Sequence, residues 1–107
     1  MCKEENFSHL IEDILKKALK KESLKEAVEI TCKCITKYYT HTQIVFAEKL
    51  GKRVSYIVGA GEETYNPSRT VILDEKYCII MQNFSNISFE EEDILVSLFK
   101  VILAVKK

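Results

Sequence analysis

The apolar residues of the chain change their spacing at Thr42, and this change limits the folds that the chain can adopt. Before Thr42 they recur every three or four positions, which is the spacing of a helix with one buried stripe. After Thr42 they alternate with polar residues or form short runs rich in Val, Ile and Tyr, as in β-strands. Helical spacing returns only after Ser88. This order predicts an α+β fold with two helices, four strands and one closing helix.

Two helices are predicted at the start of the chain. The first covers residues 7–21, where one apolar stripe repeats at helical spacing. Ser23 and Glu26 then form a capping box, in which the serine side chain accepts a free backbone amide of a new helix. The second helix is therefore expected to begin at residue 24 and to end near residues 39–41.

A hairpin is predicted after the second helix. Residues 42–47 carry apolar groups on both faces of an extended segment, which indicates an interior strand. Residues 53–60 follow a tight turn and alternate in polarity, so they are expected to pair with the first strand near a sheet edge. In this alternation Val54, Tyr56 and Val58 share one face of the strand.

A second hairpin and the closing helix complete the pattern. Residues 59–68 lack periodicity and are predicted to form a loop, and residues 69–74 and 77–84 are predicted to pair. A second capping box, Ser88 with Glu91, begins the closing helix. The four strands are expected to form an antiparallel sheet with the two N-terminal helices and the C-terminal helix on one face.

Length and charge restrict the classes of protein that fit. A chain of 107 residues is enough for a single domain covering 1–107, and its sixteen basic and sixteen acidic residues cancel. The balance does not favour direct contact with nucleic acid. The charged N-terminus has neither the apolar core of a signal peptide nor the length of a membrane span, so a cytoplasmic protein without membrane contact is expected. Its four cysteines are then expected to be reduced.

The cysteines and histidines form no motif typical of catalysis. Cys32 and Cys34 lie two positions apart on a predicted helix and would point in different directions, which disfavours a shared metal ion. Cys78 is expected to be a small core residue of a strand. His9 and His41 do not lie near a glycine-rich turn or strand tip that could hold a nucleophile. We therefore expect no enzyme, no metal and no cofactor, although a thiol-based redox or metal sensor remains an alternative.

Four stretches of the sequence together resemble the GAF family of small-molecule sensor domains. They are residues 23–30 for the opening helix, 42–48 for the first strand, 69–83 for the last hairpin and 88–95 for the closing helix. Typical members place a further strand and one or two helices between the two hairpins, where this chain has only the loop at 59–68. The resemblance implies a compact domain without the segment that closes the family's ligand pocket, so binding of a small molecule is left open.

The resemblance also implies a regulatory role. It predicts a non-catalytic domain at the N-terminus of a bacterial or archaeal signalling protein or transcription regulator, with an output domain that could follow Lys107. The alternative from another class is a stand-alone adaptor or scaffold of the roadblock or longin type. That family normally places a helix between its hairpins.

The closing helix is the predicted contact surface. Between Ile94 and Val105 its apolar side chains span roughly 220° of the helix circumference, about twice what packing on one sheet requires. Packing on the first two helices could bury this excess. The interpretation that we favour is a homodimer in which a stripe of the closing helix meets its symmetry mate, with help from the first helix. The predicted interface residues are Leu10, Ile14, Ile94, Leu98, Val101 and Val105.

Overall fold

The computed structural model describes residues 3–63, 67–84 and 87–106. Its elements follow the predicted order α-α-β-β-β-β-α, which confirms the α+β fold. None of the described helices combines the length and apolar character that crossing a membrane requires. The elements are α1 (Lys3–Ala18), α2 (Leu24–Tyr38), β1 (Gln43–Leu50), β2 (Arg53–Gly61), β3 (Ser68–Ile72), β4 (Tyr77–Gln82) and α3 (Phe89–Lys106).

The four strands form one antiparallel sheet in the order β2-β1-β4-β3. The two predicted hairpins are both present, and the pairing of β1 with β4 joins them into one sheet. This pairing places β1 in the interior and β2 at an edge, as the sequence predicts. Burial on both faces explains why β1 is apolar on both sides, with Ile44 and Phe46 buried on one face and Ala47 on the other.

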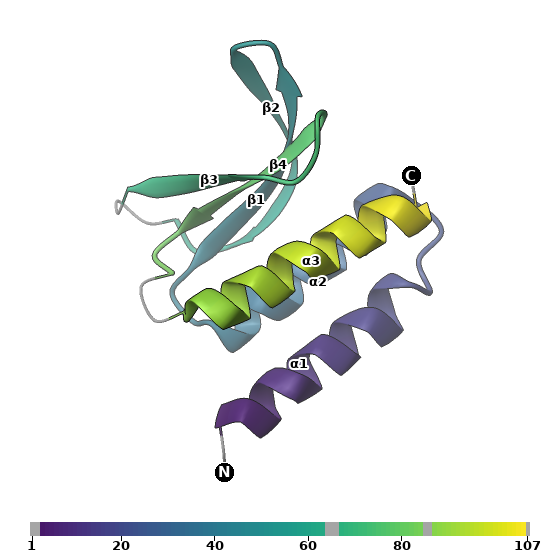
Figure 1. Cartoon of the computed structure of the whole chain (residues 1–107), viewed down its shortest axis with the longest axis vertical. Coiled ribbons are helices and arrows are strands. Elements are labelled where there is room, and N and C mark those ends of the chain that lie inside the picture. The colour runs from purple at the N-terminus through teal and green to yellow at the C-terminus, as the bar shows by residue number, and fades with distance from the viewer. Residues whose placement is uncertain (1–2, 64–66, 85–86, 107) are drawn as a thin grey trace.

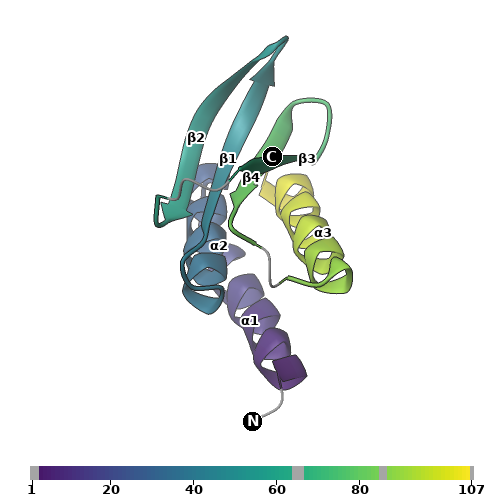
Figure 2. The same cartoon turned by 90° about the vertical axis from the view of Figure 1, so that its left-hand side faces the viewer.

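All three helices lie on one side of the sheet (Figures 1 and 2). Helices α2 and α3 lie side by side next to the sheet, and α1 lies farther from the sheet, below both of them (Figure 2). The hydrophobic core fills the space between these layers. Its largest fully buried side chains include Ile14 of α1, Ile35 of α2, Phe46 of β1 and Phe99 of α3.

One extra residue in β2 changes the face on which its later side chains lie. Phe46 pairs with Val58 and Ala47 pairs with Tyr56, so Ile57 is the extra residue of a β-bulge. Residues that pair directly across an antiparallel sheet share a face, so Val58 lies on the core side with Phe46, and Tyr56 lies on the opposite side. The prediction that Tyr56 and Val58 share one face is therefore wrong.

The predicted helix ends are correct at the capping boxes and less accurate at α1. Ser88 and Glu91 exchange two hydrogen bonds: the Glu91 amide donates to Ser88 Oγ at 3.1 Å, and the Ser88 amide donates to Glu91 Oε1 at 3.3 Å. Helix α1 begins earlier than predicted and ends at Ala18, where the Lys21 amide donates to the Ala18 carbonyl in a turn. Apolar spacing continues to Leu19, but the chain has already turned there.

Candidate functional site

The outer face of α3 carries a row of exposed apolar side chains. Ile94 is 46% exposed, Val101 is 47% exposed and Val105 is 59% exposed. Positions seven and eleven residues apart lie within a few tens of degrees of each other on a helix, so the three side chains form one stripe along the axis. The exposed and smaller Ser97 and Ala104 lie beside it. We call Ile94, Val101 and Val105 the α3 row.

The other three predicted interface residues lie inside the chain. Leu10 is 7% exposed, Ile14 is fully buried and Leu98 is 6% exposed, and all three belong to the hydrophobic core. The apolar stripe of helix α1 belongs to the hydrophobic core and packs mainly against α2, so it is already covered. The structure thus brings Ile94, Val101 and Val105 together on the surface and places Leu10, Ile14 and Leu98 beneath it.

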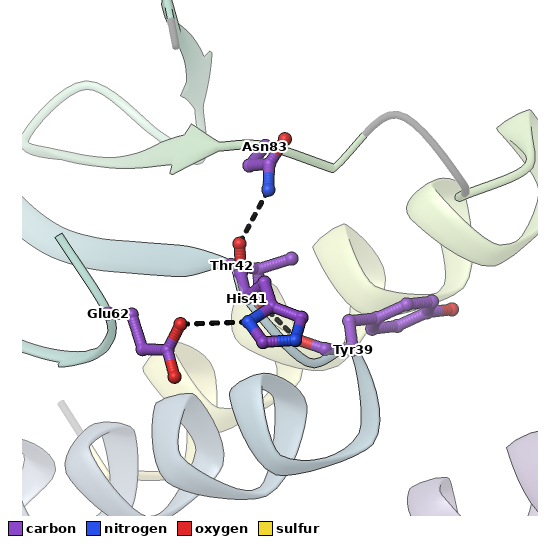
Figure 3. Close-up of polar contacts among 5 residues, drawn as sticks. All are labelled: Tyr39, His41, Thr42, Glu62 and Asn83. Carbon is purple, nitrogen blue, oxygen red and sulfur yellow. Dashed lines mark hydrogen bonds and ion pairs between the residues drawn. The ribbon is translucent and has the colours of Figure 1, made fainter. Parts of the chain in front are cut away.

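A polar junction joins the end of α2 to the ends of two strands (Figure 3). His41 Nδ1, in the link from α2 to β1, lies 3.0 Å from Glu62 Oε2, which follows β2. The Asn83 side chain, just after β4, donates to the His41 carbonyl at 2.6 Å, and the Thr42 hydroxyl donates to the Tyr39 carbonyl. His41 and Asn83 both have a positive φ, of 62° and 64°, a conformation that these two residue types tolerate better than most.

The contacts at the junction are structural. The His41 and Glu62 side chains are both mostly exposed, and the Thr42 hydroxyl is already used by the backbone. Tyr39 extends away from the imidazole (Figure 3) into an aromatic group with Tyr38 and Phe84. Its buried hydroxyl has no hydrogen-bond partner within the described residues, and burial raises the pKa of Tyr39, with a further increase from Glu91. This arrangement fixes the chain locally and offers no activated nucleophile.

The cysteines of the described chain are free thiols in different environments. Cys32 is fully buried in the core, and burial raises its pKa to about 12. Cys34, two positions later, is half-buried on another side of α2, and burial raises its pKa as well. Cys78 is buried within the sheet with a raised pKa. A neutral thiol is a poor nucleophile and metal ligand.

No group of three His, Cys, Asp or Glu side chains that could hold a metal ion occurs within residues 3–63, 67–84 and 87–106.

The sheet face opposite the helices presents a second apolar row. Cross-strand pairing links one residue from each of the four strands, so the side chains of these residues share this face. From β2 to β3 they are Tyr56, Ala47, Cys78 and Ile72. The two small inner residues are buried, and the large outer residues, Tyr56 and Ile72, are exposed. No described helix covers this face (Figure 2).

The sequence did not predict the polar junction, because its partners are 21 and 42 positions apart and carry no motif.

A scan of protein-family models, a search of curated proteins and a search of solved structures return no match for this chain. Its function must therefore be inferred from its own surfaces.

Proposed function

We propose that this chain is a non-catalytic regulatory module that forms a homodimer through the α3 row. The observation that carries the proposal is the exposure of Ile94, Val101 and Val105 in one line along the last helix. Exposed apolar groups that lie in a contiguous stripe mark contact surfaces more often than scattered ones do. A second copy fits such a stripe, because a two-fold axis brings the same stripe of two chains together.

The neighbours of the α3 row support a helix-to-helix contact. Ser97 and Ala104 are small and exposed, so a second helix can approach the α3 backbone closely beside the row. Ile94 and Val101 are seven positions apart, the repeat at which the same face of a helix returns in a paired bundle. In this dimer Leu10, Ile14 and Leu98 stabilise each subunit from within and do not contact the partner.

Regulation is the role that a GAF-like domain of this kind would have. In this proposal the domain is cytoplasmic, in keeping with the free thiols of Cys32, Cys34 and Cys78, and it passes the state of the dimer to a segment after Lys107. The native reading frame distinguishes this regulatory role from the alternative of a stand-alone adaptor. Continuation into an ATPase, kinase or DNA-binding segment supports the regulatory class, and a natural stop at Lys107 supports the adaptor.

The dimer is tested by sedimentation of the full chain at tens of micromolar. The wild-type protein should sediment as a dimer, and the double substitution Ile94→Glu/Val101→Glu should yield monomers. Both sites are about half exposed, so the charges are accommodated in a folded monomer but would be buried without partners in the dimer. Circular dichroism should show an unchanged fold.

A matched control places two glutamates on other exposed apolar sites. Leu50→Glu/Tyr56→Glu makes the same change in net charge and also replaces two exposed apolar side chains, but it lies on the β1–β2 hairpin. This variant should remain dimeric. A monomeric wild-type protein would refute the proposal, and dissociation of the hairpin variant in place of the α3 variant would move the interface to the β1–β2 hairpin.

A further inference from the structure

An open groove of about 740 Å³ runs between α1 and α2. Its lining extends from His9 to Lys17 along α1 and from Ile30 to Tyr38 along α2. Eight residues of helix correspond to about 12 Å, so the groove has the length of about two helical turns. Among the described residues its lining comes from α1 and α2 alone, so pairing of the α3 row leaves it available.

The floor of the groove is apolar. Leu10 from α1 lines the groove together with Ile30 and Tyr38 from α2. Ile30, Cys34 and Tyr38 are only partly buried, which means that the core of this chain does not cover them completely. An incoming apolar side chain would bury what they leave exposed.

The rim of the groove is basic, although the chain as a whole is neutral. Four lysines and two carboxylates line it. Lys17 pairs with Asp13 of α1 at 3.1 Å, and Lys33 pairs with Glu29 of α2 at 4.0 Å. Lys16 on one rim and Lys37 on the other make no ion pair with the described residues. Lys33 and Lys37 lie one turn apart on α2, a like-charge spacing that destabilises an isolated helix slightly. Lys16 and Lys37, one on each rim, therefore favour an anionic occupant.

The Cys34 thiol indicates how closely the two rims face each other. It donates a hydrogen bond to Asp13 Oδ2 on α1 at 3.9 Å. Burial raises its pKa most and Asp13 adds to the increase, while Lys17 from α1 and Lys37 from α2 oppose it. Charged groups of both helices therefore lie close enough to act on the same thiol.

We propose that this groove binds an amphipathic helix of a partner protein, with apolar residues facing the floor and carboxylates facing the lysines on both rims. A helix fits between two others by ridges-into-grooves packing, and the apolar floor gives it more than a charge to bind. Fixed anions such as phosphates would use the rim and leave the floor exposed. The partner is therefore defined by two features together: leucine-like side chains at helical spacing and acidic flanks.

The test uses a fluorescein-labelled synthetic helix of about five turns, with leucines three and four residues apart and glutamates on both flanks. Fluorescence anisotropy with the full chain should show saturable binding that weakens with added salt. A twin peptide with lysines in place of the glutamates should not bind. In a Cys2→Ser background, the acidic peptide should also slow alkylation of Cys34, because Cys32 and Cys78 are buried.

Charge reversal on the rim distinguishes binding in the groove from non-specific electrostatic attraction of the peptide to the protein. Lys16→Glu/Lys37→Glu should weaken binding of the acidic peptide by at least about tenfold and should allow the lysine twin to bind. Lys25→Glu/Lys52→Glu makes the same change of net charge at exposed lysines outside the groove and should bind like the wild type. Equal effects of the two double variants would overturn the proposal.

Two further outcomes would assign the groove to another occupant. If a peptide of residues 87–99 competes as strongly as the acidic peptide, the occupant is the acidic start of α3 in a second copy of this chain. If replacing the leucines by alanine costs nothing and single-stranded RNA competes, the rim recognises polyanions. Because anisotropy reports binding to monomer and dimer alike, failure here is distinguishable from failure of the α3 dimer.

Discussion

The Lys106 ammonium, in the last turn of α3, donates a hydrogen bond of 2.9 Å to the backbone carbonyl of Leu19, just past the end of α1. The two residues are 87 positions apart. A carbonyl at the end of a helix has no partner within the helix, so a cation there satisfies it and also suits the helix dipole. This contact ties the last helix to the first and helps to fix where α1 ends.

Loss of this contact should have a small, local effect. Lys106→Met keeps most of the side-chain volume and removes the donor, so the free energy of unfolding should fall by about 1 kcal/mol. Urea unfolding measures the change, and hydrogen exchange should increase mainly at the end of α1. Lys100→Met, at an exposed position of the same helix, is the control and should be nearly neutral. Equal losses in both variants would mean that the contact contributes nothing specific.

Leu98 and Val101 should respond differently to truncation, although both lie in the predicted dimer stripe. Leu98 is buried in the core, so Leu98→Ala should cost about 2–5 kcal/mol of unfolding free energy. Val101 is about half exposed, so Val101→Ala should cost less than about 1 kcal/mol in dilute protein. Urea unfolding at a concentration below dimer formation makes the comparison. A large cost at Val101 under these conditions would show that it packs within the monomer.

Gly61 and Gly51 both have positive φ, but only one has neighbours that exclude a side chain. A Cβ on Gly61, where φ is 106°, would lie 2.1 Å from the Thr42 carbonyl oxygen, and on Gly51 it would meet nothing within 4 Å. Gly61→Ala should therefore cost about 2 kcal/mol or more, and Gly51→Ala about 1 kcal/mol from backbone strain alone. Thermal or urea unfolding gives both values. The reverse ranking would contradict the close approach of the strand end to Thr42.

Alkaline pH should destabilise the fold through Cys32. Its pKa rises from 9.0 to about 12 on folding, because burial disfavours the thiolate. The folded state therefore holds this proton more tightly, so its contribution is complete below about pH 9 and is lost as the pH rises toward about 12. Above about pH 9 the free energy of unfolding should fall by up to about 1.4 kcal/mol per pH unit for this proton.

The matched variant for this measurement is Cys32→Ala. Its stability at neutral pH should be lower, because the buried sulfur atom is lost, but its further loss at alkaline pH should be shallower. Cys78 and Tyr39 also have raised pKa values and titrate in both proteins, so the difference in slope reports Cys32. Identical slopes would show that the Cys32 thiol does not titrate during unfolding.

Local interactions explain why the sequence predicted the elements well. Periodicity and the Ser88–Glu91 capping box depend on residues three or four positions apart, so their physics is complete within a short segment. The β-bulge at Ile57 was not predictable in this way, because it depends on the register between β2 and β1. One inserted residue reverses the faces of every later side chain of the strand, and no local pattern marks it.

The same distinction between local interactions and interactions of distant residues applies to the surfaces. The sequence by itself determined that α3 carries more apolar surface than one sheet can cover. Only the tertiary structure decided which part stays outside: Leu98 belongs to the hydrophobic core, while Val101 remains exposed. The groove between α1 and α2 likewise exists only once two separate helices pack. Helical spacing fixes which residues share a stripe, but burial depends on neighbours that are distant in sequence and meet only in the folded chain.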